Sequence, residues 1–67
     1  MKRFPVSSSR MVSVGYENNT LEVEFTDGVI YQYYNVSPTT YSWFINSPSL
    51  GSALSVLDKQ HRYRRVN

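Results

Sequence analysis

Residues 11–34 read MVSVGYENNTLEVEFTDGVIYQYY, and most of the architecture can be predicted from them. Apolar and polar side chains alternate along this stretch, which is the pattern of a half-buried β-strand. Asn18-Asn19 and Asp27-Gly28 interrupt the alternation. Both dipeptides tolerate the positive φ angles that hairpin turns require. The stretch therefore predicts a three-stranded antiparallel meander.

The first turn determines which residues face each other in the first hairpin. A two-residue loop at Asn18-Asn19 aligns the apolar residues of the two flanking segments on one face of the sheet. We therefore expect three cross-strand pairs: Tyr16 with Leu21, Val14 with Val23, and Val12 with Phe25.

The second turn allows two registers. A two-residue loop at residues 27–28 pairs Phe25 with Ile30. That register brings Gln32 onto the apolar face. A three-residue loop that ends on a left-handed Gly28 keeps the opposite face polar, and we favour it because a one-residue slip reverses every side chain. It pairs Phe25 with Val29, Val23 with Tyr31 and Leu21 with Tyr33, and it turns Glu22, Glu24, Thr26 and Gln32 toward solvent.

Two short helices are predicted after the meander. Ser37-Pro38 and Ser47-Pro48 each combine an N-cap residue with a proline suited to the first helical turn. We expect both helices to pack on the apolar face of the sheet, which gives an α+β fold. Apolar residues at helical spacing mark the buried faces: Tyr41, Phe44 and Ile45 in the first helix, and Leu50, Ala53, Leu54 and Leu57 in the second.

The length and composition limit the chain to one small domain over residues 1–67. A domain of this size buries only about 60% of the surface of its unfolded chain. Without cysteine, neither disulfides nor zinc thiolates can reinforce it. Six tyrosines, three phenylalanines and one tryptophan therefore have to supply an aromatic core. We expect residues 1–8 to be a loose N-terminus and residues 60–67 to be a basic C-terminal segment.

The sequence offers little for catalysis or metal binding. His61 is the single histidine, and without cysteine there is no Cys–His pair and no multi-histidine metal site. The three glycines are isolated, so no phosphate-binding loop is present. Glu22 and Glu24 share the outer face of one predicted strand, where their expected role is to keep the protein soluble. We therefore predict no catalytic residue, no metal and no cofactor.

No part of the sequence predicts a membrane association. No apolar stretch approaches the roughly 20 residues of a membrane-spanning helix. The start, MKRFPVSSSR, has basic residues but no apolar run behind them, so it is not a secretory signal. We expect a cytoplasmic protein without a membrane partner.

Charge is distributed unevenly, and the C-terminal end QHRYRRVN is the best candidate for a binding site. Residues 1–10 and 58–67 hold every lysine and arginine, whereas residues 11–57 hold all but one of the acidic residues. Arginine binds phosphate bidentately and stacks on bases, and an interleaved tyrosine adds stacking. The sequence therefore predicts a contact with RNA or another polyanion at Lys59, Arg62, Tyr63, Arg64 and Arg65.

Each candidate contact also has a purely structural interpretation. The basic segment can be a solvated tail or a short edge strand over residues 62–66, with charges that deter sheet aggregation. Ser49 and Gly51, at the start of the second helix, suit an anion bound at a helix N-terminus. Equally, Ser47 or Ser49 can cap the helix while Gly51 packs against the sheet. The tyrosines could stack on bases, but the favoured register places Tyr31 and Tyr33 under the helices and Tyr34 on the polar face.

Several residues occur in an order similar to that of a known family. The order runs from two serines through V-x-Y, L-x-V-x-F, a glycine, Y-x-Y and V to S-x-G and a final Y-x-R-R-V. It resembles the KTSC domain, a short module named for the C-terminus of some lysyl-tRNA synthetases and also found as a small free-standing bacterial or phage protein. The resemblance implies a small α+β fold and an association with translation or RNA. The matching residues are Ser8, Ser9, Val14, Tyr16, Leu21, Val23, Phe25, Gly28, Tyr31, Tyr33, Val36, Pro48, Ser49, Gly51, Tyr63, Arg64, Arg65 and Val66.

Two functions are compatible with these observations. The first is a non-enzymatic accessory module that contacts nucleic acid, RNA in particular, through the basic C-terminal segment. The alternative is a protein-interaction or homodimerisation module that uses apolar and aromatic surface left exposed by two short helices. The salt dependence of binding separates the two, because phosphate contacts weaken steeply with salt.

Overall fold

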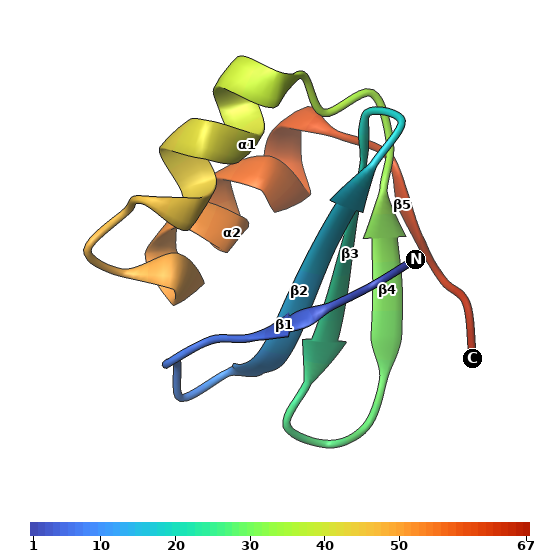
Figure 1. Cartoon of the computed structure of the whole chain (residues 1–67), viewed down its shortest axis with the longest axis vertical. Coiled ribbons are helices and arrows are strands. Elements are labelled where there is room, and N and C mark those ends of the chain that lie inside the picture. Colours follow the sequence, from blue (N-terminus) through green and yellow to red (C-terminus); the bar gives the residue numbers. More distant parts are fainter.

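A computed structural model, which describes residues 1–67, contains a five-stranded antiparallel sheet. Figure 1 shows both helices on one side of this sheet. The strands lie side by side in sequence order, from β1 to β5. The predicted α+β class is therefore confirmed, with one strand added at each edge of the meander. The elements are β1 (Phe4–Pro5), β2 (Met11–Glu17), β3 (Thr20–Phe25), β4 (Ile30–Tyr33), α1 (Pro38–Ile45), α2 (Leu50–Gln60) and β5 (Tyr63–Arg65).

Both hairpins of the meander have the favoured registers near their turns. Asn18 and Asn19 have φ angles of 51° and 60°, as a two-residue hairpin loop requires. In the second turn Gly28 is left-handed with a φ of 90°, and the Phe25 N–H donates to the Val29 carbonyl at 2.9 Å. The confirmed cross-strand pairs are Tyr16 with Leu21, Val14 with Val23, Leu21 with Tyr33, and Val23 with Tyr31.

The predicted pair of Val12 with Phe25 is wrong, because β2 contains a bulge at this point. Met11, not Val12, lies opposite Phe25, and the register shifts between Met11 and Ser13. A bulge sets two residues of one strand against one of its partner, which reverses the direction of the side chains beyond it. Met11 is therefore buried in the core, while 45% of Val12 is exposed.

The two helices begin at serine caps, but only the first helix begins at its predicted Ser-Pro pair. Ser37 caps α1, and Pro38 occupies the first turn as expected. The predicted Ser47-Pro48 start of the second helix is wrong, since Ser49 is the N-cap of α2 and accepts from the Ser52 N–H at 3.3 Å. Ser47 instead donates its hydroxyl to the Ser49 carbonyl, in the connection before the helix.

Ser49→Ala is expected to lower the free energy of unfolding by about 1 kcal/mol, because an N-cap oxygen satisfies a helix N–H that is otherwise unpaired. Ser47→Ala, two residues earlier, should change it by at most about 0.5 kcal/mol, since its hydroxyl caps no helix. Urea titrations of both variants measure these values. Equal effects at the two positions would contradict the assignment of Ser49 as the cap.

The core lies between the helices and the inner face of the sheet. Tyr33 is almost completely buried, and Tyr31 is half-buried at the edge of the same face, so the predicted orientation of both tyrosines is confirmed. Tyr16 stacks on Tyr41 of α1 with ring centroids 4.4 Å apart. The buried apolar residues are Met11, Val14, Leu21, Val23, Tyr33, Val36, Phe44, Ala53, Leu54 and Leu57.

The N-terminus is not loose as predicted, because residues 4–5 form strand β1 along β2. The chain before β1 crosses the outer face of the sheet over Gly15. A Cβ at Gly15 would overlap the backbone carbonyl oxygen of Lys2. Glycine is therefore needed at this position for the close approach of the two backbones. Val6, after β1, packs against the core.

A polar cluster under the N-terminal segment buries Glu22, which the sequence predicted to face solvent. Arg3 donates from Nη1 to Glu22 Oε2 at 2.5 Å and from Nε to Ser13 Oγ at 3.1 Å. Gln32 donates from Nε2 to Glu22 Oε1 at 2.8 Å. Burial by itself raises the pKa of Glu22, but the hydrogen bonds from Gln32 and Arg3 and the Arg3 charge outweigh it and lower the pKa.

Neither helix is long and apolar enough to cross a membrane.

Candidate functional site

The basic C-terminal segment forms edge strand β5, which is one of the two structural interpretations of the sequence. Tyr63 pairs with Tyr33, Arg64 with Gln32, and Arg65 with Tyr31. Successive side chains of a strand point to opposite faces. Tyr63 and Arg65 therefore lie on the helix side of the sheet, and Arg64 lies on the outer side.

The final residue, Asn67, anchors this strand through contacts that the sequence did not predict. Its Nδ2 donates to the Gly28 carbonyl at 2.8 Å, and its Oδ1 accepts from the Ile30 N–H at 2.9 Å. The Val66 N–H also donates to the Ile30 carbonyl at 2.9 Å. The end of the chain is thus fastened to the second hairpin.

Four basic side chains, which we call the basic rim, lie along this edge of the fold. All four are exposed, and none has a carboxylate within 4.0 Å, since the ion pairs of the chain both involve Arg3. Arg65 donates from Nε to Asn67 Oδ1 at 3.3 Å, but no carboxylate neutralises any of the four charges, so they remain available to an external anion. The basic rim consists of Lys59, at the end of α2, and Arg62, Arg64 and Arg65 on and beside β5.

Tyr63, the aromatic member of the predicted contact, is only partly free. Its ring lies 5.3 Å from the Tyr31 ring and 5.0 Å from the Tyr33 ring, centroid to centroid. It nevertheless leaves 45% of its surface exposed. Tyr63 therefore joins the core to the basic rim and keeps one side open for stacking.

Ser49 and Gly51, the second predicted contact, are engaged within the fold. The Ser49 hydroxyl serves as the N-cap of α2, as described above. Arg10 lies against Gly51: its Nη1 donates to the Gly51 carbonyl at 3.1 Å and to Ser55 Oγ at 3.3 Å. Gly51 thus packs against Arg10 and not against the sheet, and an anion site here stays a prediction.

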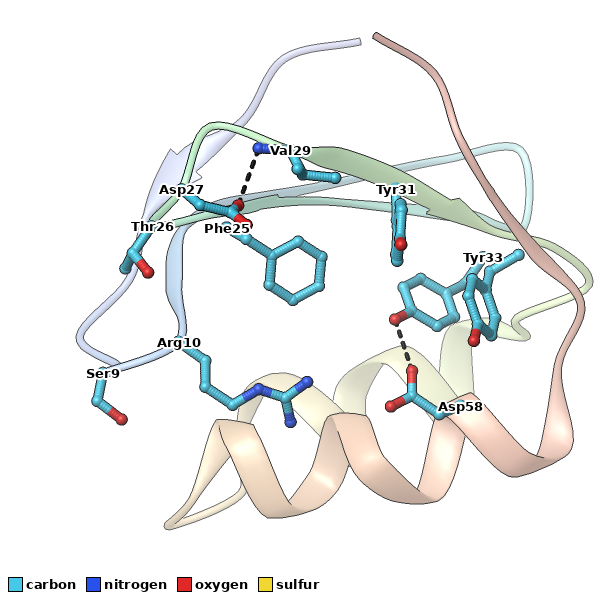
Figure 2. Close-up of a pocket in the computed structure, with 10 residues that line it drawn as sticks. Ser9, Arg10, Phe25, Thr26, Asp27, Val29, Tyr31, Tyr33 and Asp58 are labelled. Carbon is cyan, nitrogen blue, oxygen red and sulfur yellow. Dashed lines mark hydrogen bonds between the residues drawn. The ribbon is translucent and has the colours of Figure 1, made fainter.

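A cleft of about 410 Å³ lies between the sheet and α2 (Figure 2). It was not among the sites predicted from the sequence. Figure 2 shows the rings of Phe25, Tyr31 and Tyr33 directed from the sheet toward α2, with Arg10 and Asp58 on the helix side. The lining residues are Ser9, Arg10, Phe25, Thr26, Asp27, Val29, Tyr31, Tyr33, Asp58 and Tyr63.

Hydrogen bonds hold the polar side chains of the cleft in place. The Tyr33 hydroxyl donates to Asp58 Oδ1 at 2.7 Å. Burial of Tyr33, followed by its hydrogen bond to Asp58 and the charge of that carboxylate, raises the tyrosine pKa far above its usual range. Tyr33 therefore remains a donor to Asp58. Arg10 places its guanidinium carbon 5.9 Å from the centre of the Phe25 ring.

One sequence signal could have located this cleft. Asp58 follows Leu54 by four residues, so it continues the buried stripe of the second helix. The favoured register of the sheet placed Phe25, Tyr31 and Tyr33 on the face opposite that stripe. A carboxylate on a buried stripe needs a polar partner. For Asp58 this partner is the Tyr33 hydroxyl.

Comparisons with known proteins agree with the fold. The model of the KTSC domain family matches residues 7–63. An uncharacterised protein from Stutzerimonas stutzeri (strain A1501) is 38% identical over 66 residues, which cover 96% of this chain and 93% of that protein. The crystal structure of a KTSC domain protein from Yersinia pestis superimposes with a TM-score of 0.92 at 33% identity, and the match covers 98% of this chain and 97% of the other.

Proposed function

The chain belongs to the KTSC domain family, and we propose that it acts as a non-enzymatic module that binds RNA along its basic rim. The observation that carries this proposal is the freedom of the four cations, which are exposed and have no carboxylate partner. Net charge supports it, since the chain carries +2 overall and residues 58–67 hold four of its seven basic residues but only one acidic residue.

The arrangement of the basic rim suits a flexible strand better than a flat surface. Arg64 and Arg65 extend to opposite faces of the sheet from one edge strand. A single-stranded backbone that follows β5 can reach both side chains, and Tyr63 offers an exposed ring between Arg62 and Arg64. Arginine and aromatic residues interleaved in this way are the usual elements of single-strand binding.

The absence of an enzymatic role is part of the proposal. The single histidine, His61, ends α2, and its Nδ1 lies 3.0 Å from the Tyr34 carbonyl oxygen. This contact orders the connection between α2 and β5, and the chain has no second histidine and no cysteine that could act with His61. A binding role requires only the basic rim and its neighbouring surface.

Changing Arg62, Arg64 and Arg65 together to Gln is expected to abolish most of the salt dependence of RNA binding. Each arginine that neutralises a phosphate contributes about −0.7 to the slope of log affinity against log salt on single strands. The three together therefore contribute roughly −2. Fluorescence anisotropy with a labelled single-stranded RNA, at several salt concentrations, measures this slope. The melting temperature should stay almost unchanged, because exposed charges contribute little to stability.

The matched control replaces the same three arginines with lysine. It retains the charges, so it should keep most of the salt slope even if the affinity falls from loss of bidentate contacts. Loss of affinity should be similar for different RNA sequences, since phosphate contacts position a ligand but do not specify it. The proposal is wrong if the Gln variant binds as tightly as the parent, or if no RNA binds at low salt.

A second candidate function, a protein-interaction or homodimerisation module, is favoured by the outer surface of the helices. Trp43 of α1 is 49% exposed and Val56 of α2 is 39% exposed. Both line a hollow of about 290 Å³ together with Thr39, Thr40 and Gln60. Exposed tryptophan is typical of interaction hot spots. If a partner binds through this surface, Trp43→Ser should weaken the binding, and the affinity should not fall steeply with salt.

A further inference from the structure

The cleft between the sheet and α2 has the shape of a site for a flat ligand. Its volume of about 410 Å³ lies within the usual range of small-ligand pockets, about 300–1,000 Å³. The rings of Phe25 and Tyr31 meet edge to face at 5.4 Å, and Tyr63 extends this aromatic surface toward the solvent. Such walls favour a planar group that can stack.

The cleft also presents polar groups that the protein leaves unused. Arg10 donates only through Nη1, to Gly51 and Ser55, so Nε and Nη2 have no protein acceptor. Asp58 accepts from Tyr33 through Oδ1, and its Oδ2 has no protein donor. The occupant therefore meets free N–H donors on one side and a free carboxylate oxygen on the other.

The charges in the cleft exclude a phosphate group as the occupant. Arg10 is the only cation among the lining residues, whereas Asp27 and Asp58 are both acidic. An anion placed here would be repelled by the surplus carboxylate. A neutral, planar group with both donors and acceptors on its edges is the chemistry that fits. Nucleobases have these properties, and single-strand binders recognise their edges after stacking them.

The cleft is continuous with the basic rim through one residue. Tyr63 lines the cleft and also lies between Arg62 and Arg64. A strand whose phosphates follow the basic rim therefore passes the mouth of the cleft. This continuity favours a base of that strand over a separate small molecule or a side chain of another protein.

We propose that the cleft binds one unpaired nucleobase of the RNA held by the basic rim, and that it prefers a base with an exocyclic amino group over uracil. The proposal rests on the proposed function. The amino group donates to Asp58 Oδ2, and an acceptor of the base receives an N–H of Arg10. Uracil has no amino group, and its only free donor, the ring N3–H, lies between two carbonyl oxygens that the Asp58 carboxylate repels.

The test compares short uridine oligonucleotides that carry one central guanine, adenine, cytosine or uracil. Titration of the isotope-labelled full chain, followed by NMR, reports both the affinity and the amides that shift. We expect the three amino-bearing oligonucleotides to bind about tenfold more tightly than the all-uridine one, because a hydrogen bond to a charged group contributes on this scale. Amides of Phe25, Tyr31 and Asp58 should shift only with the tighter ligands.

Asp58→Asn provides the matching variant. Asparagine keeps an oxygen to accept from Tyr33 but replaces the free oxygen with an N–H donor. Asp58→Asn should therefore remove the base preference. The all-uridine oligonucleotide should bind to Asp58→Asn with the same affinity as to a control variant, Glu17→Gln. Glu17 is exposed at the end of β2, and the control makes the same change in net charge far from the cleft.

Three results would overturn the inference, and they can be told apart. If every oligonucleotide binds equally and only amides around β5 shift, the cleft proposal fails while the proposed function stands. If no oligonucleotide binds at low salt, both fail. If N-acetyl-tryptophanamide shifts the cleft amides at lower concentration than any oligonucleotide, the occupant is a protein side chain instead of a base.

Discussion

Phe44→Ala should lower the free energy of unfolding by about 3–5 kcal/mol, because it removes a buried ring and leaves a cavity in the core. Phe44 is 0% exposed and is the only residue of α1 that is fully buried. A chain of 67 residues has a total stability of roughly 3–10 kcal/mol. The variant is therefore expected to be partly or wholly unfolded at room temperature.

Its neighbour in sequence supplies the control. Trp43 is larger than Phe44 but is 49% exposed on the outer side of the same helix. Trp43→Ala should change the free energy of unfolding by about 0.5 kcal/mol or less. Urea unfolding followed by circular dichroism measures both variants. Similar losses at the two positions would show that α1 does not bury Phe44 as described.

Arg3→Met should cost about 2 kcal/mol, although Arg3 lies in a segment that the sequence predicted to be loose. The substitution leaves Glu22 buried with only Gln32 to donate to it, and an uncompensated buried charge is destabilising. The expected loss of stability is smaller than for a fully buried ion pair, because 28% of the Arg3 side chain is exposed. Thermal or urea unfolding at neutral pH provides the measurement.

The effect of Arg3→Met should depend on pH in a defined direction. In the parent the pKa of Glu22 is lowered from 4.5 in the folded state. Its contribution to stability is therefore present above about pH 4.5 and is lost as pH falls through the folded pKa. Without Arg3 its hydrogen bond and its charge no longer lower the pKa of Glu22, so acid removes less of that contribution from the variant. The gap in stability between parent and variant should narrow below this pH.

A double variant separates the charge from the packing. Arg3→Met combined with Glu22→Gln removes both partners, so no carboxylate is left uncompensated, and part of the lost stability should return. If the double variant is less stable than Arg3→Met alone, the cost arises from lost contacts of the N-terminal segment and not from the Glu22 charge.

The meander could be predicted from the sequence because its determinants are local. The turn residues Asn18, Asn19 and Gly28 fix the loop lengths, and alternation then fixes the register. The bulge in β2 could not be predicted in this way. Met11 and Val12 are both apolar, so the pattern does not show which of them lies opposite Phe25. The choice depends on contacts with β1 and with the core.

The elements missed by the sequence analysis all depend on residues far apart in the chain. Phe4 and Pro5 show no alternation, and their strand is held by contacts with β2 and by the pair of Arg3 with Glu22. The cleft brings Arg10 from before the meander to Asp58 from the second helix. Nothing in either local sequence indicates the other. For the basic segment, in contrast, the predicted residues all lie on or beside one edge strand.

The order of the strands has a consequence for how the fold assembles. Neighbouring strands from β1 to β4 follow one another along the chain, so their pairing closes only short loops. Strands β4 and β5 are neighbours in the sheet, but both helices lie between them in sequence. Closing the longer loop costs more chain entropy and delays contact formation. We therefore expect the last strand to dock on a sheet that has already formed.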